Sequence, residues 1–379
     1  MKKKILIVTT VADSLPFFKG QIDVLKKSFD VELVSSPGIQ HDEMCQMHNV
    51  QGHKLIMKRD ISFISDFRSL WNLFFLFLKI KPDVVHSNTP KAGLLATIAA
   101  WIARIPNRIY YVHGLRYHGE NGFKRKILMK MEVVSCFFAT DVIAVSNGIK
   151  TALKTDKITN KEIKVIGNGS VNGIDIDYFN PDIISDVEVY QNHNIDKKDF
   201  IFGFIGRLVG DKGINELIKA FVKINKQFDS KLLLIGTFEH ALDPLQDETL
   251  KEIENNANIL QVGFKKDVRP YLKAMDVFVF PSYREGFGIV LMEAASMGVP
   301  SISSDITGCN EIIIEGENGY LVESKNEAAL YERMLYCVEN KKVIKEMSTT
   351  TRSNIINKFE QQKHWAASLA LYEELTQQN

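Results

Sequence analysis

Short apolar runs, each followed by a polar loop, recur along the first half of the chain. Runs of this length are typical of strands buried in a parallel sheet. We predict strands at residues 5–8, 31–34 and 54–57, and others that begin near residues 82, 108 and 141. Helices are predicted at 21–27, at 66–80 and from about 93 to 104, with an irregular polar stretch at 35–52. Strands that alternate with helices predict a doubly wound α/β domain.

The second half restarts the same pattern. Apolar runs predict five strands, at residues 200–205, 231–235, 259–263, 277–280 and 300–303. A helix is predicted at 289–297, where Gly298 and Pro300 end it, and a last helical region at about 340–378. Residues 173–194 lack apolar periodicity and are interpreted as the connection between the two halves. We therefore predict one α/β domain at 1–175 and a second at 176–355, followed by a terminal segment at 356–379.

Composition narrows the class of protein. With 45% hydrophobic and 25% charged residues in 379, the chain is expected to be globular. Its four cysteines form no C-x-x-C pair, which favours a reducing cytoplasm, and neither a leader segment nor a membrane-spanning run is expected. Residues 1–175 hold 25 Lys and Arg against 15 Asp and Glu, and the remainder holds 22 against 31. A basic first half suggests an anionic substrate or surface. No recognised motif indicates nucleic acid.

The richest candidate chemistry lies in residues 280–304. A predicted strand leads into a loop with Gly286 and Gly288, and a helix follows. Free backbone N–H groups and the helix dipole at such a start favour an anion. Glu285 and Glu293 stand at the two ends of this segment and can accept hydrogen bonds from hydroxyl groups. A ligand with both hydroxyls and phosphates is predicted.

A second candidate follows the first strand of the second half. Arg207 and Lys212 stand five residues apart in the glycine-flanked run 206–213. Fixed cations at this point can stabilise a diphosphate whose charge develops as its bond to a sugar breaks.

The spacing Glu285-x7-Glu293, with Glu-Gly-Phe-Gly at its head, resembles the signature of the retaining GT-B glycosyltransferases of family 4. The resemblance implies two Rossmann-like doubly wound domains that face each other across a cleft, with the terminal helix of 356–379 packing back on the first domain. It also implies a nucleotide diphosphate sugar as donor, no other cofactor and no required metal. Hexose transfer with retention is the expected reaction.

The resemblance also implies roles for individual residues. Arg207 and Lys212 match the family's diphosphate-binding pair, and Glu285 would hold the transferred sugar. Glu293 would hold the ribose, and His113 would lie against the reacting face of the sugar. The other implied contacts are the nucleobase at Gly263 and Phe264, the sugar and phosphates at Gly206 and at the amides of Gly286, Phe287 and Gly288, and the acceptor side at Gly20.

Residues 86–93, His-Ser-Asn-Thr-Pro-Lys-Ala-Gly, look like a stretch of bacterial enzymes that build lipid-linked oligosaccharides for surface polysaccharide. Asn88 stands where a second histidine is usual, and Lys91 would face the phosphates of a lipid-linked sugar acceptor. A basic amphipathic segment nearby predicts peripheral contact with an anionic membrane at its cytoplasmic face. Its cations are Arg116, Lys124, Arg125, Lys126 and Lys130.

Some patterns are better explained by ordinary structure than by a functional site. Asp175-Ile-Asp177 resembles a metal motif of another glycosyltransferase fold, but turn chemistry is favoured. The apolar stripe of the helix at 66–80 is predicted to be core. No Gly-x-Gly-x-x-Gly follows the first strand, which argues against a nicotinamide enzyme. A non-hydrolysing sugar-nucleotide epimerase, a phosphorylase and a non-catalytic nucleotide-sugar-binding protein stay open as alternatives.

Overall fold

A computed structural model of the chain describes residues 2–60, 62–239 and 243–377. It divides into two compact units. The first comprises residues 1–173 together with 361–379, and the second comprises residues 174–360.

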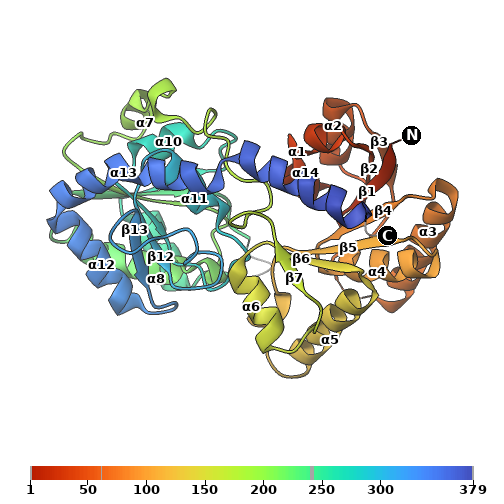
Figure 1. Cartoon of the computed structure of the whole chain (residues 1–379). Coiled ribbons are helices and arrows are strands. Elements are labelled where there is room, and N and C mark those ends of the chain that lie inside the picture. The colour runs from red at the N-terminus through yellow and green to blue at the C-terminus, as the bar shows by residue number, and fades with distance from the viewer. Residues whose placement is uncertain (1, 61, 240–242, 378–379) are drawn as a thin grey trace. The chain divides into compact units, whose positions relative to one another are not determined.

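The first unit is built on a seven-stranded sheet in the order β3-β2-β1-β4-β5-β6-β7 (Figure 1). All neighbouring strands in it run parallel. Its strands are β1 (Lys3–Val8), β2 (Phe29–Ser35), β3 (Gln51–Lys54), β4 (Val84–Asn88), β5 (Asn107–Val112), β6 (Asp141–Ala144) and β7 (Ile163–Val165). Its helices are α1 (Gln21–Leu25), α2 (Ile39–His48), α3 (Phe63–Ile80), α4 (Pro90–Ile102), α5 (Gly122–Phe138), α6 (Asn147–Thr155) and α14 (Gln361–Gln377), with short 3-10 turns at Ala12–Phe18 and Arg116–Gly119.

The second unit repeats the architecture with a six-stranded parallel sheet in the order β10-β9-β8-β11-β12-β13. Its strands are β8 (Phe200–Ile205), β9 (Ser230–Ile235), β10 (Ile259–Gly263), β11 (Val277–Phe280), β12 (Ser301–Ser304) and β13 (Gly319–Val322). Its helices are α7 (Val187–Asn192), α8 (Ile214–Asn225), α9 (Asp247–Asn255), α10 (Arg269–Ala274), α11 (Ile289–Ser296), α12 (Glu327–Glu339) and α13 (Lys341–Phe359), with short 3-10 turns at Pro181–Ile183 and Gly210–Lys212. The predicted pair of doubly wound α/β domains is confirmed.

Two predictions for residues 35–57 were wrong. The stretch expected to be irregular contains α2, and the strand expected at 54–57 lies at Gln51–Lys54. The buried positions of α2 are His41, Met44 and His48, so its inward face has helical spacing but is mostly polar and left no apolar signal. Leu55 and Met57 are buried, but they lie beyond the end of the edge strand and do not extend its ladder. Their apolar side chains therefore predicted a strand where there is none.

The apolar stripe of α3 is core only in part. Leu73 and Phe77 are fully buried against α4 and the sheet. Trp71 is 40% exposed and Leu78 46% exposed. The helix is apolar on two faces and α4 covers one, so the prediction of a simple core stripe was wrong for the outer face.

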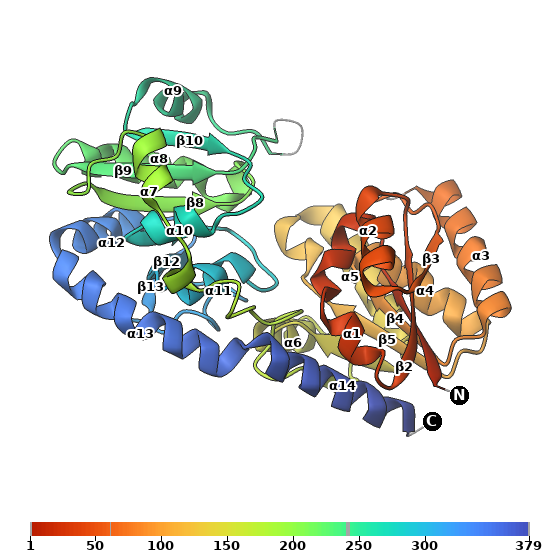
Figure 2. The same cartoon turned by 90° about the horizontal axis from the view of Figure 1, so that it is seen from above.

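The last helical region is two helices. α13 ends at Phe359 and belongs to the second unit, while α14 begins at Gln361 and belongs to the first. α14 lies beside α1, as both views show (Figure 2), and Gln21 Nε2 donates to Ser368 Oγ at 2.8 Å. Throughout the described residues, no helix is at once long and apolar enough to traverse a bilayer.

Candidate functional site

The second sheet reverses its direction of winding between β8 and β11, which lie side by side at its centre. Loops that leave the carboxyl ends of two such strands diverge and leave a crevice where ligands bind in open α/β sheets. The loop after β8 carries Arg207 and Lys212, and the loop after β11 carries Glu285. The topology therefore gathers three predicted residues at the position where a ligand is expected.

The loop after β8 is held close to the loop after β11. Gly213 has a φ of +72°, and a Cβ there would lie 2.1 Å from Pro281 O. Only glycine accommodates both this backbone and this approach. Lys212 precedes that contact directly, so the close packing of the two loops delivers its side chain toward Glu285.

Lys212 and Glu285 form an ion pair between Lys212 Nζ and Glu285 Oε1. Both side chains are largely buried, at 16% and 15% exposed. Ser282 Oγ donates to the same carboxylate oxygen at 2.8 Å, and Lys212 Nζ lies 5.4 Å from the centre of the Phe280 ring. The cation and the carboxylate are thus held together at the ends of the two strands before a ligand binds.

Arg207 is placed differently. It is half exposed, and its Nη1 donates to Glu239 Oε2 at 2.9 Å. The structure thus brings Lys212 and Glu285 into contact and directs Arg207 to another carboxylate. An exposed ion pair of this kind costs little to exchange for a phosphate partner.

Further contacts tie the two loops together. Arg284 Nη2 donates to Asp211 Oδ2 at 3.0 Å, and the Tyr283 N–H donates to Asp211 O at 2.8 Å. Tyr283 OH donates to Glu216 Oε1 on α8 at 2.7 Å. These bonds hold the loop after β11 against the start of α8.

The glycine loop after Glu285 leads directly into α11. The Gly288 N–H donates to Gly308 O at 3.0 Å, so the structure already satisfies this amide, which was predicted to contact the donor. The Phe287 ring is 7% exposed and packs edge-on against Phe359, with centroids 5.6 Å apart. Any contact of Phe287 with a ligand would therefore be through its backbone.

Glu293 lies on α11 and is partly buried. Burial raises its pKa to about 7, because the low-polarity surroundings disfavour the carboxylate. A carboxyl group that titrates near neutrality is a mark of functional sites. Phe264 follows Gly263 at the end of β10, and its side chain is 75% exposed. Gly206 follows β8 with a φ of +152°, a conformation that favours glycine.

In the first unit, the predicted histidine belongs to a buried hydrogen-bonded network. His113 Nε2 donates to Asn88 Oδ1 at 3.0 Å, and Asn88 Nδ2 donates to His86 Nδ1 at 3.3 Å. His86 Nε2 and Tyr372 OH on α14 are 3.1 Å apart. Because an amide oxygen only accepts, His113 carries its proton on Nε2. The network fixes the orientation and the tautomer of His113.

Both histidines of this network are neutral. Burial lowers the pKa of His113 to about 4 and that of His86 to about 3. The ring of Tyr111 lies edge-on to that of His113, with centroids 4.8 Å apart. At neutral pH, His113 therefore offers an unprotonated Nδ1 held in place by its neighbours.

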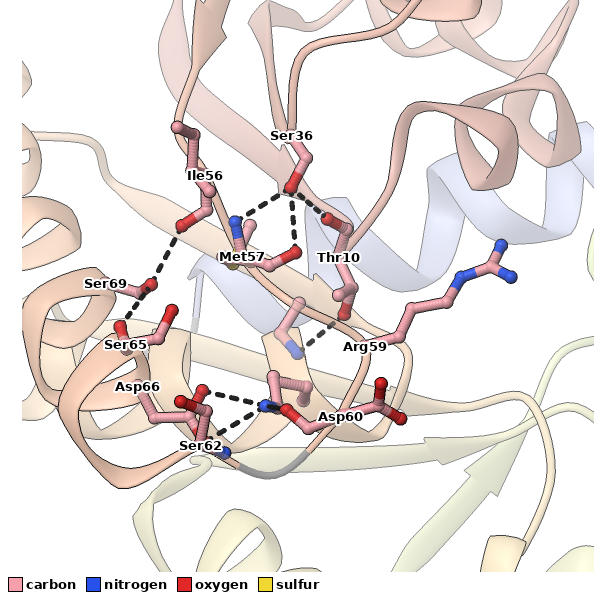
Figure 3. A network of polar contacts seen from close by, with 12 residues as sticks. Thr10, Ser36, Ile56, Met57, Arg59, Asp60, Ser62, Ser65, Asp66 and Ser69 are labelled. Atoms are coloured by element: carbon pink, nitrogen blue, oxygen red, sulfur yellow. Dashed lines mark hydrogen bonds and ion pairs between the residues drawn. The ribbon is translucent and has the colours of Figure 1, made fainter.

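Lys91 is buried, at 4% exposed, and its Nζ lies 2.8 Å from Asp66 Oδ1. Lys91 Nζ also donates to Asp60 O. Both contacts are made by the one ammonium group, and Figure 3 labels their partners, Asp60 and Asp66. In this arrangement Lys91 ties the first turn of α3 to α4, and its predicted contact with acceptor phosphates stays a prediction.

The structure requires glycine at position 20. Its φ is +79°, and a Cβ would lie 2.4 Å from the ring of Trp365 on α14. Trp365 Nε1 donates to Asn172 Oδ1 at 2.7 Å, and Asn172 Nδ2 donates to Lys19 O at 3.0 Å. The loop before α1, the turn near residue 172 and α14 therefore form one anchored cluster.

The motif at 175–177 is a turn, as the sequence favoured. Asp175 Oδ1 accepts from the N–H groups of Asp177 and Tyr178, at 3.2 and 2.9 Å. Among the residues that the structure describes, no group of three or more His, Cys, Asp and Glu is arranged to hold a metal ion.

Comparison with known proteins decides the family. Residues 24–171 match the family described as Glycosyltransferase Family 4, and residues 188–354 match the one described as Glycosyl transferases group 1. The chain is also 38% identical over 373 residues to the capsular polysaccharide biosynthesis glycosyltransferase CapM of Staphylococcus aureus, covering 98% of this chain and 97% of that one. The chain belongs to the family 4 and group 1 glycosyltransferases.

Other relatives of this glycosyltransferase have named substrates. It is 31% identical over 306 residues to an Escherichia coli UDP-Gal:alpha-D-GlcNAc-diphosphoundecaprenol alpha-1,3-galactosyltransferase, covering 79% of this chain and 78% of the relative. It is 27% identical over 334 residues to a Campylobacter jejuni N,N'-diacetylbacillosaminyl-diphospho-undecaprenol alpha-1,3-N-acetylgalactosaminyltransferase, covering 85% of each.

Solved structures establish the fold of this glycosyltransferase. The HepE protein of Anabaena in complex with UDP superposes with a TM-score of 0.79, at 20% identity and 100% coverage of both chains. A glycosyltransferase of Rickettsia africae gives a TM-score of 0.78, at 22% identity, covering 99% of this chain and 98% of that one. With the two parallel sheets, these confirm the predicted GT-B fold class.

The sequence predicted no supporting role for three residues of this glycosyltransferase. Ser282 holds Glu285, Asn88 holds His113, and Tyr372 closes the network from α14. Ser282 and Asn88 are polar residues at or next to the carboxyl ends of strands, a position that could have drawn attention to them. Tyr372 lies 286 residues from His86 and gives no local signal.

Proposed function

We propose that this glycosyltransferase moves a hexose from a nucleotide diphosphate sugar to a sugar carried on a polyprenyl diphosphate, with retention at the anomeric carbon. The observation that carries the proposal is the buried Lys212–Glu285 pair at the point where the second sheet reverses. It sets a cation for phosphate beside a carboxylate for sugar hydroxyls. Identity of 38% and 31% to enzymes of capsule and lipid-linked sugar assembly supports the acceptor class.

The proposed donor is a UDP-sugar, with an N-acetylhexosamine or a galactose-type hexose first and GDP-mannose second. The names of two relatives support this order, since one uses UDP-Gal and the other transfers N-acetylgalactosamine. Glu293 would accept from the ribose hydroxyls, and Phe264 would lie by the base. Gly206 and the loop 286–288 would adjoin the sugar and the diphosphate.

In the proposed reaction, Lys212 and Arg207 bind the diphosphate as its bond to the sugar breaks. Each would exchange a carboxylate partner for phosphate oxygens, which neutralises the leaving group without a metal. Glu285, still held by Ser282, would accept from hydroxyls of the transferred sugar. His113 would present its neutral imidazole to the reacting face.

The proposed acceptor places the enzyme at the inner face of the cytoplasmic membrane as a peripheral protein. Gly20 and Lys91 belong to the acceptor side of this proposal. The basic segment of α5 is one candidate for the contact, although Lys124 pairs with Glu120 at 2.6 Å and Arg125 lies 3.8 Å from Asp156. Assembly of a surface polysaccharide such as capsule is the proposed role.

The test is a thermal-shift screen of UDP- and GDP-sugars, followed by transfer to a lipid-linked sugar with and without EDTA. A UDP-sugar should raise the melting temperature, and NMR of the product should give the anomeric configuration of the donor. Inverted product would contradict retention, and loss of activity in EDTA restored by manganese would contradict a metal-free reaction. Interconversion of the UDP-sugar without transfer would favour an epimerase, and binding without any turnover a non-catalytic protein.

A further inference from the structure

One face of α3 is apolar and exposed. Phe63 is 87% exposed, Ile64 88%, Phe67 63% and Phe75 61%. Trp71 on the same helix is 40% exposed. Scattered exposed apolar side chains are ordinary, but a contiguous set of large ones marks an interaction surface.

These side chains share one side of the helix. At 3.6 residues per turn, the exposed apolar residues of α3 fall within an arc of about 120°, with Arg68 and Lys79 following at its edge. We call this arc the α3 ridge, and its members are Phe63, Ile64, Phe67, Trp71, Phe75 and Leu78. The Trp71 ring lies 6.0 Å from that of Phe67 and 6.1 Å from that of Phe75. Three rings of the ridge, those of Phe67, Trp71 and Phe75, therefore follow one another along the helix.

The ridge cannot turn inward, because the opposite face of α3 is fixed. Leu73 and Phe77 are fully buried in the core with α4. Lys91 binds Asp66 in the first turn, and Ser69 Oγ donates to Ile56 O at 2.8 Å (Figure 3). Met57, ahead of the helix, is held as well, since Ser36 Oγ accepts from its N–H at 2.8 Å. The exposed face is therefore a preformed feature of the fold.

The charge beside the ridge is positive. Asp66, which pairs with Lys91, is the single acidic residue of α3. The exposed cations on and around the helix are Lys58, Arg59, Arg68, Lys79 and Lys81, and they outnumber the exposed carboxylate of Asp60 just before it. A groove of about 1090 Å³ adjoins the ridge, and its lining includes Ile56, Ile64, Phe75, Arg68 and Lys79. Apolar and cationic groups thus meet along one surface.

We propose that the α3 ridge is the surface by which this enzyme docks on an anionic lipid bilayer, with α3 lying in the plane of the interface. Aromatic side chains inserted among headgroups, with cations facing anionic lipids, are the features of an interfacial helix. A second copy of the chain would bring the same cations against one another. The inference deepens the proposed function, because a lipid-linked acceptor must be met at a bilayer, yet its test needs no transfer reaction.

The test compares two surfaces in the full chain. Sedimentation with vesicles of equal phosphatidylglycerol and phosphatidylcholine is measured for wild type, for Phe63→Ser with Phe67→Ser, and for a matched pair on α5, Phe123→Ser with Phe137→Ser. The α5 positions are 78% and 71% exposed, so both pairs remove exposed rings. The α3 pair should lower the partition coefficient at least tenfold, and the α5 pair less than twofold. Arg68→Glu with Lys79→Glu should also lower it on these vesicles.

A second measurement does not depend on how the double variant folds. Brominated lipids should quench the fluorescence of wild type, and Trp71→Phe should remove most of that quenching. Unchanged partition of the α3 pair, loss of binding in the α5 pair, or quenching that survives Trp71→Phe would overturn the proposal. So would a dimer in solution that only the α3 pair dissociates while vesicle binding persists.

Transfer to a water-soluble acceptor separates this proposal from the proposed function. The α3 variants should keep the wild-type rate with such an acceptor, because the ridge is placed outside the transfer machinery. Vesicle binding by an enzyme that transfers nothing would leave the ridge supported and the proposed function refuted.

Discussion

The two sheets of this glycosyltransferase have the same strand order around their reversal points, β1 beside β4 and β8 beside β11, but different chemistry there. In the second unit, the reversal point carries Lys212 and Glu285, an ion pair that keeps some solvent contact. In the first unit, the corresponding strand β4 ends at Asn88, which is fully buried. The side chain of Asn88 accepts a hydrogen bond from the neutral His113, which follows β5. One topology supports a charged site in one unit and a neutral network in the other.

The two arrangements suit different ligands and different tasks. Paired charges can exchange partners when a charged ligand arrives, at a modest cost in free energy while solvent remains. A buried neutral network cannot exchange partners cheaply, because any group left without a hydrogen bond is penalised. The second unit is therefore suited to bind a diphosphate, and the first to hold one imidazole in a fixed orientation.

The largest expected effect comes from removing the buried cation. Lys212→Ala should lower kcat/KM roughly 1000-fold, because a preorganised charge facing the leaving group is lost. Steady-state kinetics with the identified donor measures this. The matched control is Lys223→Ala, which removes another lysine from an ion pair, with Glu327 at 2.7 Å. A comparable loss in the control would mean that the effect is structural.

Glu285→Gln should have the next largest effect. We expect kcat to fall about 100-fold with KM nearly unchanged, because the carboxylate would bind sugar hydroxyls more tightly in the transition state. Gln preserves the shape of the side chain, so folding is not at issue. Full turnover combined with weaker donor binding would assign Glu285 to ground-state binding only.

In the first unit, Asn88→Ala should lower kcat about tenfold, because His113 loses the acceptor that fixes its tautomer. Tyr372→Phe, which removes a more distant member of the network, should cost less. NMR titration gives an independent check. Asn88→Asp would place a carboxylate beside the ring and should move the midpoint of His113 upward from about 4. An unmoved midpoint would show that residue 88 does not control the imidazole.

The smallest expected effect is a pH dependence of UDP affinity. The pKa of Glu293 is raised to about 7, so the carboxyl is protonated below this pH and ionised above it. Ribose hydroxyls donate more strongly to a carboxylate, so affinity should rise a few-fold, by about 1 kcal/mol, as pH increases from 6 to 8. Calorimetry should show this rise in wild type and a flat profile in Glu293→Gln. A rise that persists in the variant would assign the titration to another group.

Much of this organisation could be predicted from the sequence, because buried parallel strands and glycine loops leave local signals. The strands of the second unit were placed within a residue or two, although β13 was missed. α2 was missed because His41 and His48 occupy its buried face. The exposure of the α3 ridge could not be predicted, since an apolar residue reads the same whether or not a neighbour covers it. The contact of Tyr372 with His86 depends on the fold and has no local signal.

Calorimetric titration of UDP and of uridine, with wild type and with Lys212→Ala, tests most directly whether the charged reversal point binds a diphosphate. The account predicts that the substitution weakens UDP binding about 30-fold, the equivalent of one charged hydrogen bond of about 2 kcal/mol, and leaves uridine binding unchanged. Equal affinities of wild type and variant for UDP would contradict it.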